Sequence, residues 1–492
     1  MRNFRQRIKL ASTGLVALAL ASCTAGGPIP SASTPITAAE AQQGANYHPQ
    51  LLAEFGGAMS GPQAAYVEQV GKNIAAYSQL GNARESFNVT LLNSSVNNAF
   101  AVPGGYIYTT RQLVALMDNE AELAAVLGHE VGHVAARHSE RRQRKAQRNS
   151  ILGVLGAIGS SVLLGDSQIG NVLTRGALQA PQFLTLAYSR EQEEEADRLG
   201  IDYLSRANYD PQAMGDLLER LTQQNDLEAR LQGRESARPP VWASTHPEPV
   251  ARVRLARSYA SQKPGSMTNR DTFLSRIDGM IYGDDPEQGV IQGNQFIHPK
   301  LLLAFTAPQG FYMVNSTRAV SINGQSGQAQ LSLGPYAGDL DSYVRQQFAA
   351  LGGENSRIAP NSIERTSVNG LQAAYGTTRV NNGSGQVDLV VFAYEFAPNR
   401  AYHFSAITPV GGSATFASMF QSMRRISSAE AAQVVPRRID VVTVQRGDSV
   451  SSLARRMAYD QAREERFRVL NGMGPNDQLV AGRKVKLVVS GR

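Results

Sequence analysis

The chain has 492 residues, which is more than one hydrophobic core usually organises, so we expect two or three domains. Hydrophobic residues make up 42% and charged residues 18%, a composition that excludes a disordered chain and a polytopic membrane protein. The formal net charge of +7 is unevenly placed, because residues 436–492 hold twelve Lys and Arg against six Asp and Glu.

The N-terminus has the pattern of a secretory signal. An apolar run over residues 10–21, too short to span a bilayer comfortably, follows four cations, Arg2, Arg5, Arg7 and Lys9. The run leads into Leu-Ala-Ser-Cys at residues 20–23, which resembles the bacterial lipobox, and Cys23 is the only cysteine of the chain. We expect Cys23 to be lipidated and to begin the mature protein, although a plain signal peptide with a chance cysteine is the alternative. By resemblance to Gram-negative sorting rules, Thr24 in place of Asp implies an anchor in the outer membrane, facing the periplasm.

Residues 24–45 are rich in Ser, Thr, Pro, Gly and Ala, which predicts a flexible tether. Helical patterns dominate residues 46–285 and predict one mostly helical domain, with helices over 62–79, 119–137, 191–206 and 211–224. Strands are predicted over 87–92 and 100–109, and Pro103 inside the second indicates an edge strand. The apolar stretch 151–165 ends at Asp166, so it predicts a buried or surface-dipping segment and not a membrane span.

Residues 297–427 predict a β-rich α+β domain. Its expected strands cover 301–305, 319–322, 363–368, 371–380, 387–396 and 402–407, and its expected helices cover 339–351 and 414–425. Asn-Gly pairs at 369–370 and 382–383 are typical of hairpin turns. We find no catalytic constellation in this segment, so we expect an interaction or packing domain.

The last fifty residues resemble a LysM module. The resemblance lies in VTVQRGDSV at 442–450, LARR at 453–456, FRVLNG at 467–472 and LVAGRKVKL at 479–487, which predict a strand, two helices and a strand over residues 440–489. LysM modules bind glycans that contain N-acetylglucosamine, so the resemblance implies a contact with peptidoglycan, and a module without a working glycan groove is the alternative. In an exported protein, the basic C-terminal segment suits a cell-wall or anionic-envelope contact better than a contact with nucleic acid.

The segment HEVGH at 129–133 contains candidate metal ligands and a candidate general base. Side chains four residues apart lie on one face of a helix, so His129 and His133 can share one zinc ion. Glu130 lies beside a ligand and can take a proton from water that the metal activates for attack on a polarised carbonyl. Asn119 with Glu122 three residues later predicts a capping box at the start of this helix.

A hydrolytic zinc site needs a third protein ligand, and Glu193 is the candidate. It lies in SREQEEEAD at 189–197, at the start of a predicted helix, with Asp197 four residues later on the same face. Asp197 can then orient His129 or His133. A solvated acidic helix start is the alternative, since the helix dipole favours negative charge there.

Together these motifs resemble the family of zinc peptidases that includes HtpX and the CAAX prenyl proteases, over roughly residues 46–285, and more closely its periplasmic members that do not span the membrane. The resemblance implies a gluzincin-type fold and selects Glu193 over its acidic neighbours Glu191, Glu194 and Glu195. The segment NAFAVPGG at 98–105 resembles the family's edge strand before the active-site helix, where Asn98 and Ala99 would pair with an extended substrate.

Thr-His-Pro at 245–247, with Arg252 six residues after the histidine, resembles a downstream element of the family that lies over the zinc. His246 then either stabilises the oxyanion or fills the fourth zinc position as a reversible plug. We expect His138 to face away from the ligands and to serve packing or surface contacts.

The sequence thus predicts an α+β multidomain protein and a zinc metalloendopeptidase with one Zn²⁺ per chain. Envelope quality control, with unfolded or misassembled envelope proteins as substrates, is the favoured activity. A tethered chaperone or cell-wall scaffold, and a peptidoglycan-directed hydrolase, remain the alternatives.

Overall fold

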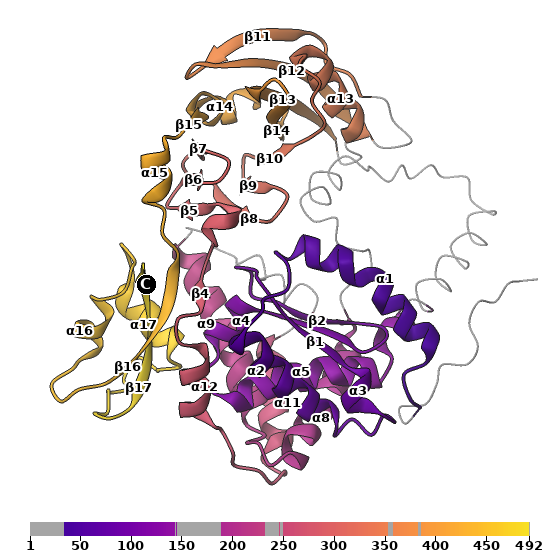
Figure 1. The fold of residues 1–492 in the computed structure, drawn as a ribbon, viewed down its shortest axis with the longest axis vertical. Coiled ribbons are helices and arrows are strands. Elements are labelled where there is room, and N and C mark those ends of the chain that lie inside the picture. The colour runs from indigo at the N-terminus through magenta and orange to yellow at the C-terminus, as the bar shows by residue number, and fades with distance from the viewer. Residues whose placement is uncertain are drawn as a thin grey trace, which may run out of the picture.

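The computed structural model describes residues 34–142, 144, 188–231, 246, 249–352, 358–381 and 385–491. The predicted signal peptide, Cys23, the apolar stretch 151–165 and the turn at 382–383 lie outside these residues. Figure 1 shows an N-terminal domain at the lower right, a central domain at the top and a C-terminal module at the lower left. Within the described residues, no helix is both long and apolar enough to cross a membrane.

The N-terminal domain surrounds a three-stranded sheet. Its strands are β1 (Asn88–Leu92), β2 (Ala99–Val102) and β3 (Tyr106–Thr110), in the order β1-β3-β2. Its helices are α1 (Ala38–Glu54), α2 (Pro62–Ala75), α3 (Ala83–Ser86), α4 (Arg111–Leu116), α5 (Glu120–Ala135), α8 (Arg190–Arg206), α9 (Ala213–Leu231), α11 (Pro249–Ala260) and α12 (Arg270–Ile277).

The two faces of this sheet bury alternate side chains, as the pleat of a strand requires. Phe100 and Tyr108 pack with Leu51 of α1, whereas Ala101 and Ile107 belong to the larger core that contains α2 and α5. The sheet is therefore enclosed between α1 and the helix that carries the HEVGH segment.

Two predictions for this domain are wrong. The tether expected to reach residue 45 is helical from Ala38 on, and a capping box between Thr37 and Glu40 starts the helix. The strand predicted over 100–109 is two antiparallel strands, β2 and β3, joined by a turn. Gly104 and Gly105 have φ of +87° and +79° in that turn, a conformation that glycine adopts without steric cost.

The central domain contains two antiparallel sheets. The larger has the order β11-β12-β13-β14-β10-β9-β8 and the smaller has the order β15-β7-β6-β5. Their strands are β5 (Val290–Gln292), β6 (Gln295–His298), β7 (Leu303–Thr306), β8 (Tyr312–Asn315), β9 (Val320–Gly324), β10 (Gly327–Leu333), β11 (Ile363–Val368), β12 (Leu371–Asn381), β13 (Gln386–Ala397), β14 (Arg400–Pro409) and β15 (Arg424–Arg425).

The six predicted strands of this domain are present, and α13 (Leu340–Gly352) packs on the larger sheet through Val344 and Phe348. The helix predicted over 414–425 is wrong in extent. It is replaced by a 3-10 turn (Ser413–Phe416), the short α14 (Ala417–Ser422) and the strand β15.

The C-terminal module contains β16 (Arg437–Thr443), α16 (Val450–Ala454), α17 (Arg463–Leu470) and β17 (Lys484–Ser490), the predicted order of elements. The module is not a detached unit. β16 also pairs with β4 (Ile281–Tyr282), and Leu453, Phe467 and Leu487 belong to the same buried core as α5 and α9.

Buried polar contacts reinforce this junction. The ammonium of Lys486, fully buried, donates hydrogen bonds to the carbonyl oxygens of Ala115, Leu116 and Met117 at the C-terminal end of α4. Unpaired carbonyls at a helix end attract a cation, so β17 closes this end of α4. The next helix along the chain is α5.

Candidate active site

Helix α5 presents the HEVGH segment inside the domain. Asn119 caps the helix by accepting a hydrogen bond of 3.0 Å from the backbone N–H of Glu122. The reciprocal half of the predicted capping box differs, because the Glu122 carboxylate accepts from the backbone N–H of Asp118 and pairs with Arg220 of α9.

Close contact between α5 and α8 brings Glu193 to the two histidines. A Cβ added at Gly200 of α8 would lie 3.1 Å from the backbone N of His129, and one added at Gly132 would lie 3.1 Å from the carbonyl oxygen of Ala196. Both contacts are to backbone atoms and are tighter than a Cβ usually makes, so glycine at these two positions lets the helices approach without a shift of either backbone.

The start of α8 favours a negative charge. The Ser189 side chain and Gln192 form a capping box there, and Glu193 follows within the first turn. The structure therefore places the Glu193 carboxylate near the positive end of the helix dipole and opposite α5.

Four buried side chains converge at this point: His129, His133, Glu193 and His246, with one potential ligand atom of each within 4.8 Å of the others. Nε2 of His129 lies 2.9 Å from Nε2 of His133, and the carboxylate of Glu193 lies 3.6 and 3.5 Å from these two nitrogens.

Ligand atoms of a tetrahedral zinc ion lie about 3.4 Å apart, and imidazole and carboxylate are donors that zinc prefers. The four residues therefore fit a single zinc ion, with His246 in the fourth position.

A buried network of ion pairs contacts His129 and Glu193. Asp197 lies 2.9 Å from Nδ1 of His129 and accepts hydrogen bonds of 2.6 and 2.8 Å from Arg252, which also pairs with Glu193. Burial alone would raise the pKa of both carboxylates. The nearby His246 and then Arg252 hold the pKa of Glu193 below its usual range, and the charge and hydrogen bonds of Arg252, with a hydrogen bond from His129, do the same for the pKa of Asp197.

Glu130 is fully buried beside the cluster, with His246 Nε2 at 3.7 Å from its Oε1. Neither carboxylate oxygen has a hydrogen-bond partner within the described residues. Burial is the main reason that the pKa of Glu130 is raised, and the nearby Glu193 carboxylate adds to it. A carboxyl group with a raised pKa can accept and return a proton near neutral pH.

The expectation for His138 is wrong. The helix ends at Ala135, and Arg137 has a φ of +51°, so the chain turns back and His138 does not continue on the far side of α5. His138 is fully buried, with Nδ1 at 2.8 Å from Nδ1 of His133 and Nε2 at 3.2 Å from Glu195. His138 thus contacts Nδ1 of His133, as the carboxylate of Asp197 contacts Nδ1 of His129.

Sequence reasoning also missed Tyr188. Its ring stacks on the imidazole of His133 at 3.9 Å between centroids and closes that side of the cluster. Tyr188 immediately precedes the N-cap Ser189 of α8, and this adjacency to a predicted helix start was the available signal.

The predicted substrate residues lie at the edge of the three-stranded sheet. Ala99 begins β2, and Asn98 precedes it with a hydrogen bond of 3.0 Å from the Thr110 N–H to its carbonyl. Both are buried, as are the four convergent side chains and Glu130, so the site is closed in this conformation.

Comparisons with known proteins agree with this geometry. Residues 62–260 match the model of peptidase family M48, and residues 442–488 match that of the LysM domain. The beta-barrel assembly-enhancing protease of Escherichia coli (strain K12) is 35% identical over 198 residues, which cover 40% of this chain and 39% of that protein. The protein of the same name from Yersinia pestis is 36% identical over 225 residues, which cover 45% of this chain and 44% of that protein.

A more distant relative is the mitochondrial metalloendopeptidase OMA1 of Schizosaccharomyces pombe, 29% identical over 226 residues that cover 45% of this chain and 60% of that protein. The chain thus spans less than half the length of the two bacterial proteases it matches. The convergent residues of α5 and α8 lie inside the segment that matches peptidase family M48. We refer to the two matched segments as the peptidase domain (residues 62–260) and the LysM domain (residues 442–488), after the models that they match.

Proposed function

We propose that this protein is a zinc metalloendopeptidase of the bacterial envelope. The observation that carries the proposal is the convergence of His129, His133 and Glu193 with the buried Glu130 beside them. A site that only stabilised the fold would need no base next to its ligands. A bound zinc ion would polarise the scissile carbonyl and lower the pKa of water.

The protein's own residues supply the remaining functions. Glu130 takes a proton from the attacking water on one carboxylate oxygen and passes it to the leaving amine. Asp197 holds His129 so that Nε2 is free for the metal, and Arg252 keeps Glu193 and Asp197 ionised. Asn98 and Ala99, at the edge strand, are proposed to pair with the backbone of an extended substrate.

His246 is proposed to act as a plug that restrains the resting enzyme. Its Nδ1 lies 3.2 Å from Nε2 of His129 and 3.0 Å from Glu193, within the set of four that fits one metal ion. With His246 in the fourth position, no position is open for a substrate carbonyl. Activation then requires His246 to leave.

We further propose that the protein is a lipoprotein anchored through Cys23 to the outer membrane, facing the periplasm. The relatives named as beta-barrel assembly-enhancing proteases support unfolded or misassembled envelope proteins as substrates. The LysM domain supports a contact with peptidoglycan.

Metal removal tests the proposal. Purified full-length protein treated with 1,10-phenanthroline should lose both its zinc and its cleavage of a reduced, carboxymethylated protein, and stoichiometric Zn²⁺ should restore cleavage. Cleavage that persists in protein shown to be free of metal would contradict it.

A further inference from the structure

The ring of His138 connects a proposed metal ligand to the surface of the protein. Its Nδ1 lies 2.8 Å from Nδ1 of His133, and its Nε2 lies 3.2 Å from Oε2 of Glu195. The side chains of His138 and His133 are buried, whereas the side chain of Glu195 is 43% exposed. Each nitrogen of the His138 ring therefore has a polar partner, one inside the site and one at the surface.

Helix α8 holds His138 in this place through two residues three apart, which lie on one side of the helix. The Gln192 side chain donates a hydrogen bond of 3.1 Å to the carbonyl oxygen of His138, and the Glu195 carboxylate contacts the ring. Glu193 and Asp197 belong to the same helix. One helix thus supplies a proposed ligand and also the side chains that surround His138.

The backbone turn that precedes His138 is fixed as well. Arg137 has a left-handed φ of +51°, which is uncommon for a residue other than glycine. Its guanidinium donates hydrogen bonds to the carboxylate of Glu40 and to the carbonyl oxygens of Thr34 and Pro35. These contacts stabilise the turn that directs His138 back toward the cluster.

The ligand role of His133 determines where the ring protons lie. Its Nε2 faces the cluster, 2.9 Å from Nε2 of His129, so a His133 that binds metal through Nε2 carries its proton on Nδ1. That N–H donates to Nδ1 of His138, which then carries its own proton on Nε2. The Glu195 carboxylate can only accept, and it lies where this second N–H needs an acceptor.

We propose that His138 is a positioning residue for the metal ligand His133, and that Glu195 fixes the tautomer in which His138 can accept from it. The inference rests on the proposed function, because His133 is a ligand only if the cluster binds zinc. A side chain that merely filled space behind His133 could be replaced by any other of similar size. A positioning residue, in contrast, must present a hydrogen-bond acceptor to Nδ1 of His133.

The two ligand histidines are oriented by groups of different strength. Asp197 contacts His129 with a carboxylate that also pairs with Arg252 at 2.6 Å, whereas His138 is uncharged in the tautomer derived above. Hydrogen bonds to an ionised group are roughly twice as strong as neutral ones. We therefore expect loss of the acceptor at residue 138 to weaken zinc binding by about tenfold, the lower end of the range for such partners.

Two substitutions at residue 138 separate the acceptor from the packing. His138→Phe keeps a planar ring and removes the acceptor, whereas the side-chain oxygen of His138→Asn is bonded to Cγ, as Nδ1 is in histidine. In full-length protein, competition with a chelating dye should show about tenfold weaker zinc binding for His138→Phe and most of the affinity restored in His138→Asn. Equal affinity of His138→Phe and the wild type would overturn the proposal, and so would an equal loss in both variants.

Cobalt reports the geometry of the site independently of affinity. The visible absorption bands of bound Co²⁺ depend on the arrangement of its ligands. With Co²⁺ in place of zinc, the bands of His138→Phe should shift from those of the wild type, and those of His138→Asn should not. Identical bands in all three proteins would contradict a positioning role.

Glu195→Ala tests the outer contact at a partly exposed position. Without the carboxylate the tautomer of His138 is no longer fixed, so zinc affinity should fall roughly two- to tenfold, as expected for one hydrogen bond. Glu194→Ala is the control, since Glu194 lies on the same helix and pairs with Arg198 at 3.6 Å. Equal zinc affinities in these two variants would overturn the role of Glu195.

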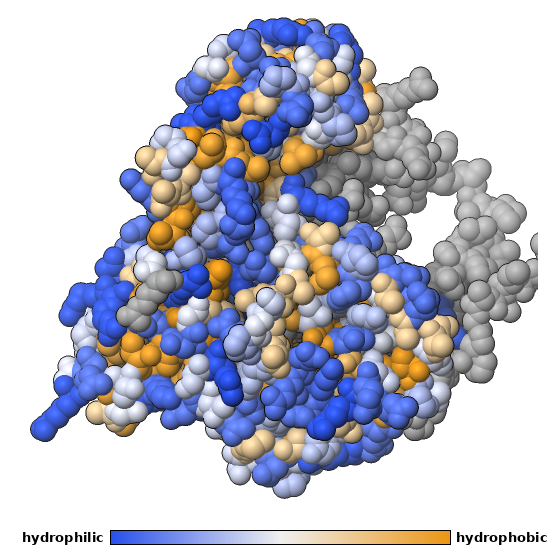
Figure 2. All heavy atoms as spheres, in the orientation of Figure 1, coloured by the Kyte–Doolittle hydropathy of each residue, from blue (hydrophilic) through white to orange (hydrophobic). Residues whose placement is uncertain are grey.

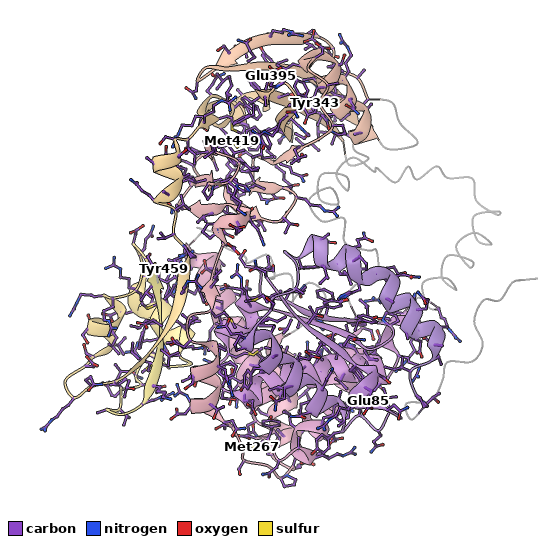
Figure 3. The ribbon with its side chains drawn as sticks, in the orientation of Figure 1. Glu85, Met267, Tyr343, Glu395, Met419 and Tyr459 are labelled. Carbon is purple, nitrogen blue, oxygen red and sulfur yellow. The ribbon has the colours of Figure 1, made fainter. Side chains whose placement is uncertain are left out.

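His403 is the matched histidine control. It is buried, and its Nδ1 lies 2.9 Å from the hydroxyl of Tyr343, which Figure 3 shows in the central domain. Figure 2 shows a hollowed and largely hydrophilic surface between that domain and the body below it. His403→Gln should therefore leave zinc affinity and the cobalt bands unchanged at pH 7. A loss equal to that of His138→Phe would show that any buried histidine affects the site, and would overturn the proposal.

The positioning role and the proposed function fail separately. If the wild type binds zinc but does not cleave an unfolded protein, the peptidase function fails, and the zinc affinities of the variants at residue 138 still decide the role of His138. If the wild type cleaves and His138→Phe binds zinc as tightly, with unchanged cobalt bands, the positioning role alone is wrong.

Discussion

The carboxylate of Asp197 lies 2.9 Å from Nδ1 of His129, and both side chains are buried. The carboxylate selects the tautomer in which Nδ1 carries the proton and Nε2 faces Glu193 and His133. Asp197→Ala should therefore weaken zinc binding by roughly 10- to 100-fold, as determined by competition with a chelating dye.

Asp202 on the same helix provides the matched control. It pairs with Lys263 and Tyr259 away from the cluster, so Asp202→Ala should leave zinc affinity unchanged. Equal zinc affinity in the Asp197 variant and the wild type would contradict the role of Asp197.

The plug predicts a gain of activity on removal of one side chain. His246→Ala should retain zinc on His129, His133 and Glu193 and should cleave an unfolded protein faster than the wild type, because the fourth position is then open. Initial rates and bound zinc measured on the same preparations check this. Unchanged or slower proteolysis with zinc retained would count against the plug and favour a role in stabilising the oxyanion.

From the hydrogen bonds of Lys486 to the end of α4 we predict that the LysM domain stabilises the peptidase domain. Lys486→Met leaves the three carbonyls at the end of α4 without their buried partner and should lower the free energy of unfolding by about 1–3 kcal/mol. Lys484→Met on the same strand is the control, since Lys484 contacts the exposed Ser275 and should cost little. Chemical denaturation of both variants would decide this, and equal midpoints would show that the Lys486 contacts do not stabilise the junction of the two domains.

From the burial of His403 we predict that the central domain becomes less stable in acid. Burial lowers the pKa of His403 to about 4, and the Tyr343 hydroxyl lies 2.9 Å from its Nδ1. In the unfolded chain the histidine has a pKa near 6.5, whereas in the folded protein it stays neutral down to about pH 4. The contribution of His403 to the free energy of unfolding is therefore complete above pH 6.5 and is lost as the pH falls toward 4, by about 3 kcal/mol in total. His403→Gln should reduce this pH dependence in denaturation curves at pH 4–7. An unchanged slope would show that His403 does not carry it.

The local parts of the site could be predicted from the sequence. Spacing within one helix places His129 and His133 on one face, and the same rule places Glu193 and Asp197 together on α8. The glycines that allow the two helices to touch, Gly132 and Gly200, carry no such signal, because a glycine in a helix does not reveal which backbone it will meet.

The failures have physical reasons as well. The expectation for His138 extended a helix that ends two residues before Arg137, where a left-handed residue turns the chain back. The helix α1 was missed because Ser, Thr, Pro and Ala suggested a tether, although the Thr37–Glu40 capping box was present in the sequence.

Contacts between distant segments could not be predicted. Lys486 is one of many basic residues near the C-terminus, and its acceptors on α4 precede it by about 370 residues. Nothing local distinguishes a buried lysine from a solvated one before its partner is known.

Comparison of the wild type with Glu130→Gln tests the central claim most directly. Glutamine has nearly the same shape as glutamate and cannot accept the proton, while His129, His133 and Glu193 stay in place. Zinc content and cleavage of a reduced, carboxymethylated protein should be measured on the same full-length preparations. We predict that Glu130→Gln retains zinc and loses cleavage by at least about 100-fold, whereas equal cleavage by the two proteins would contradict the mechanism.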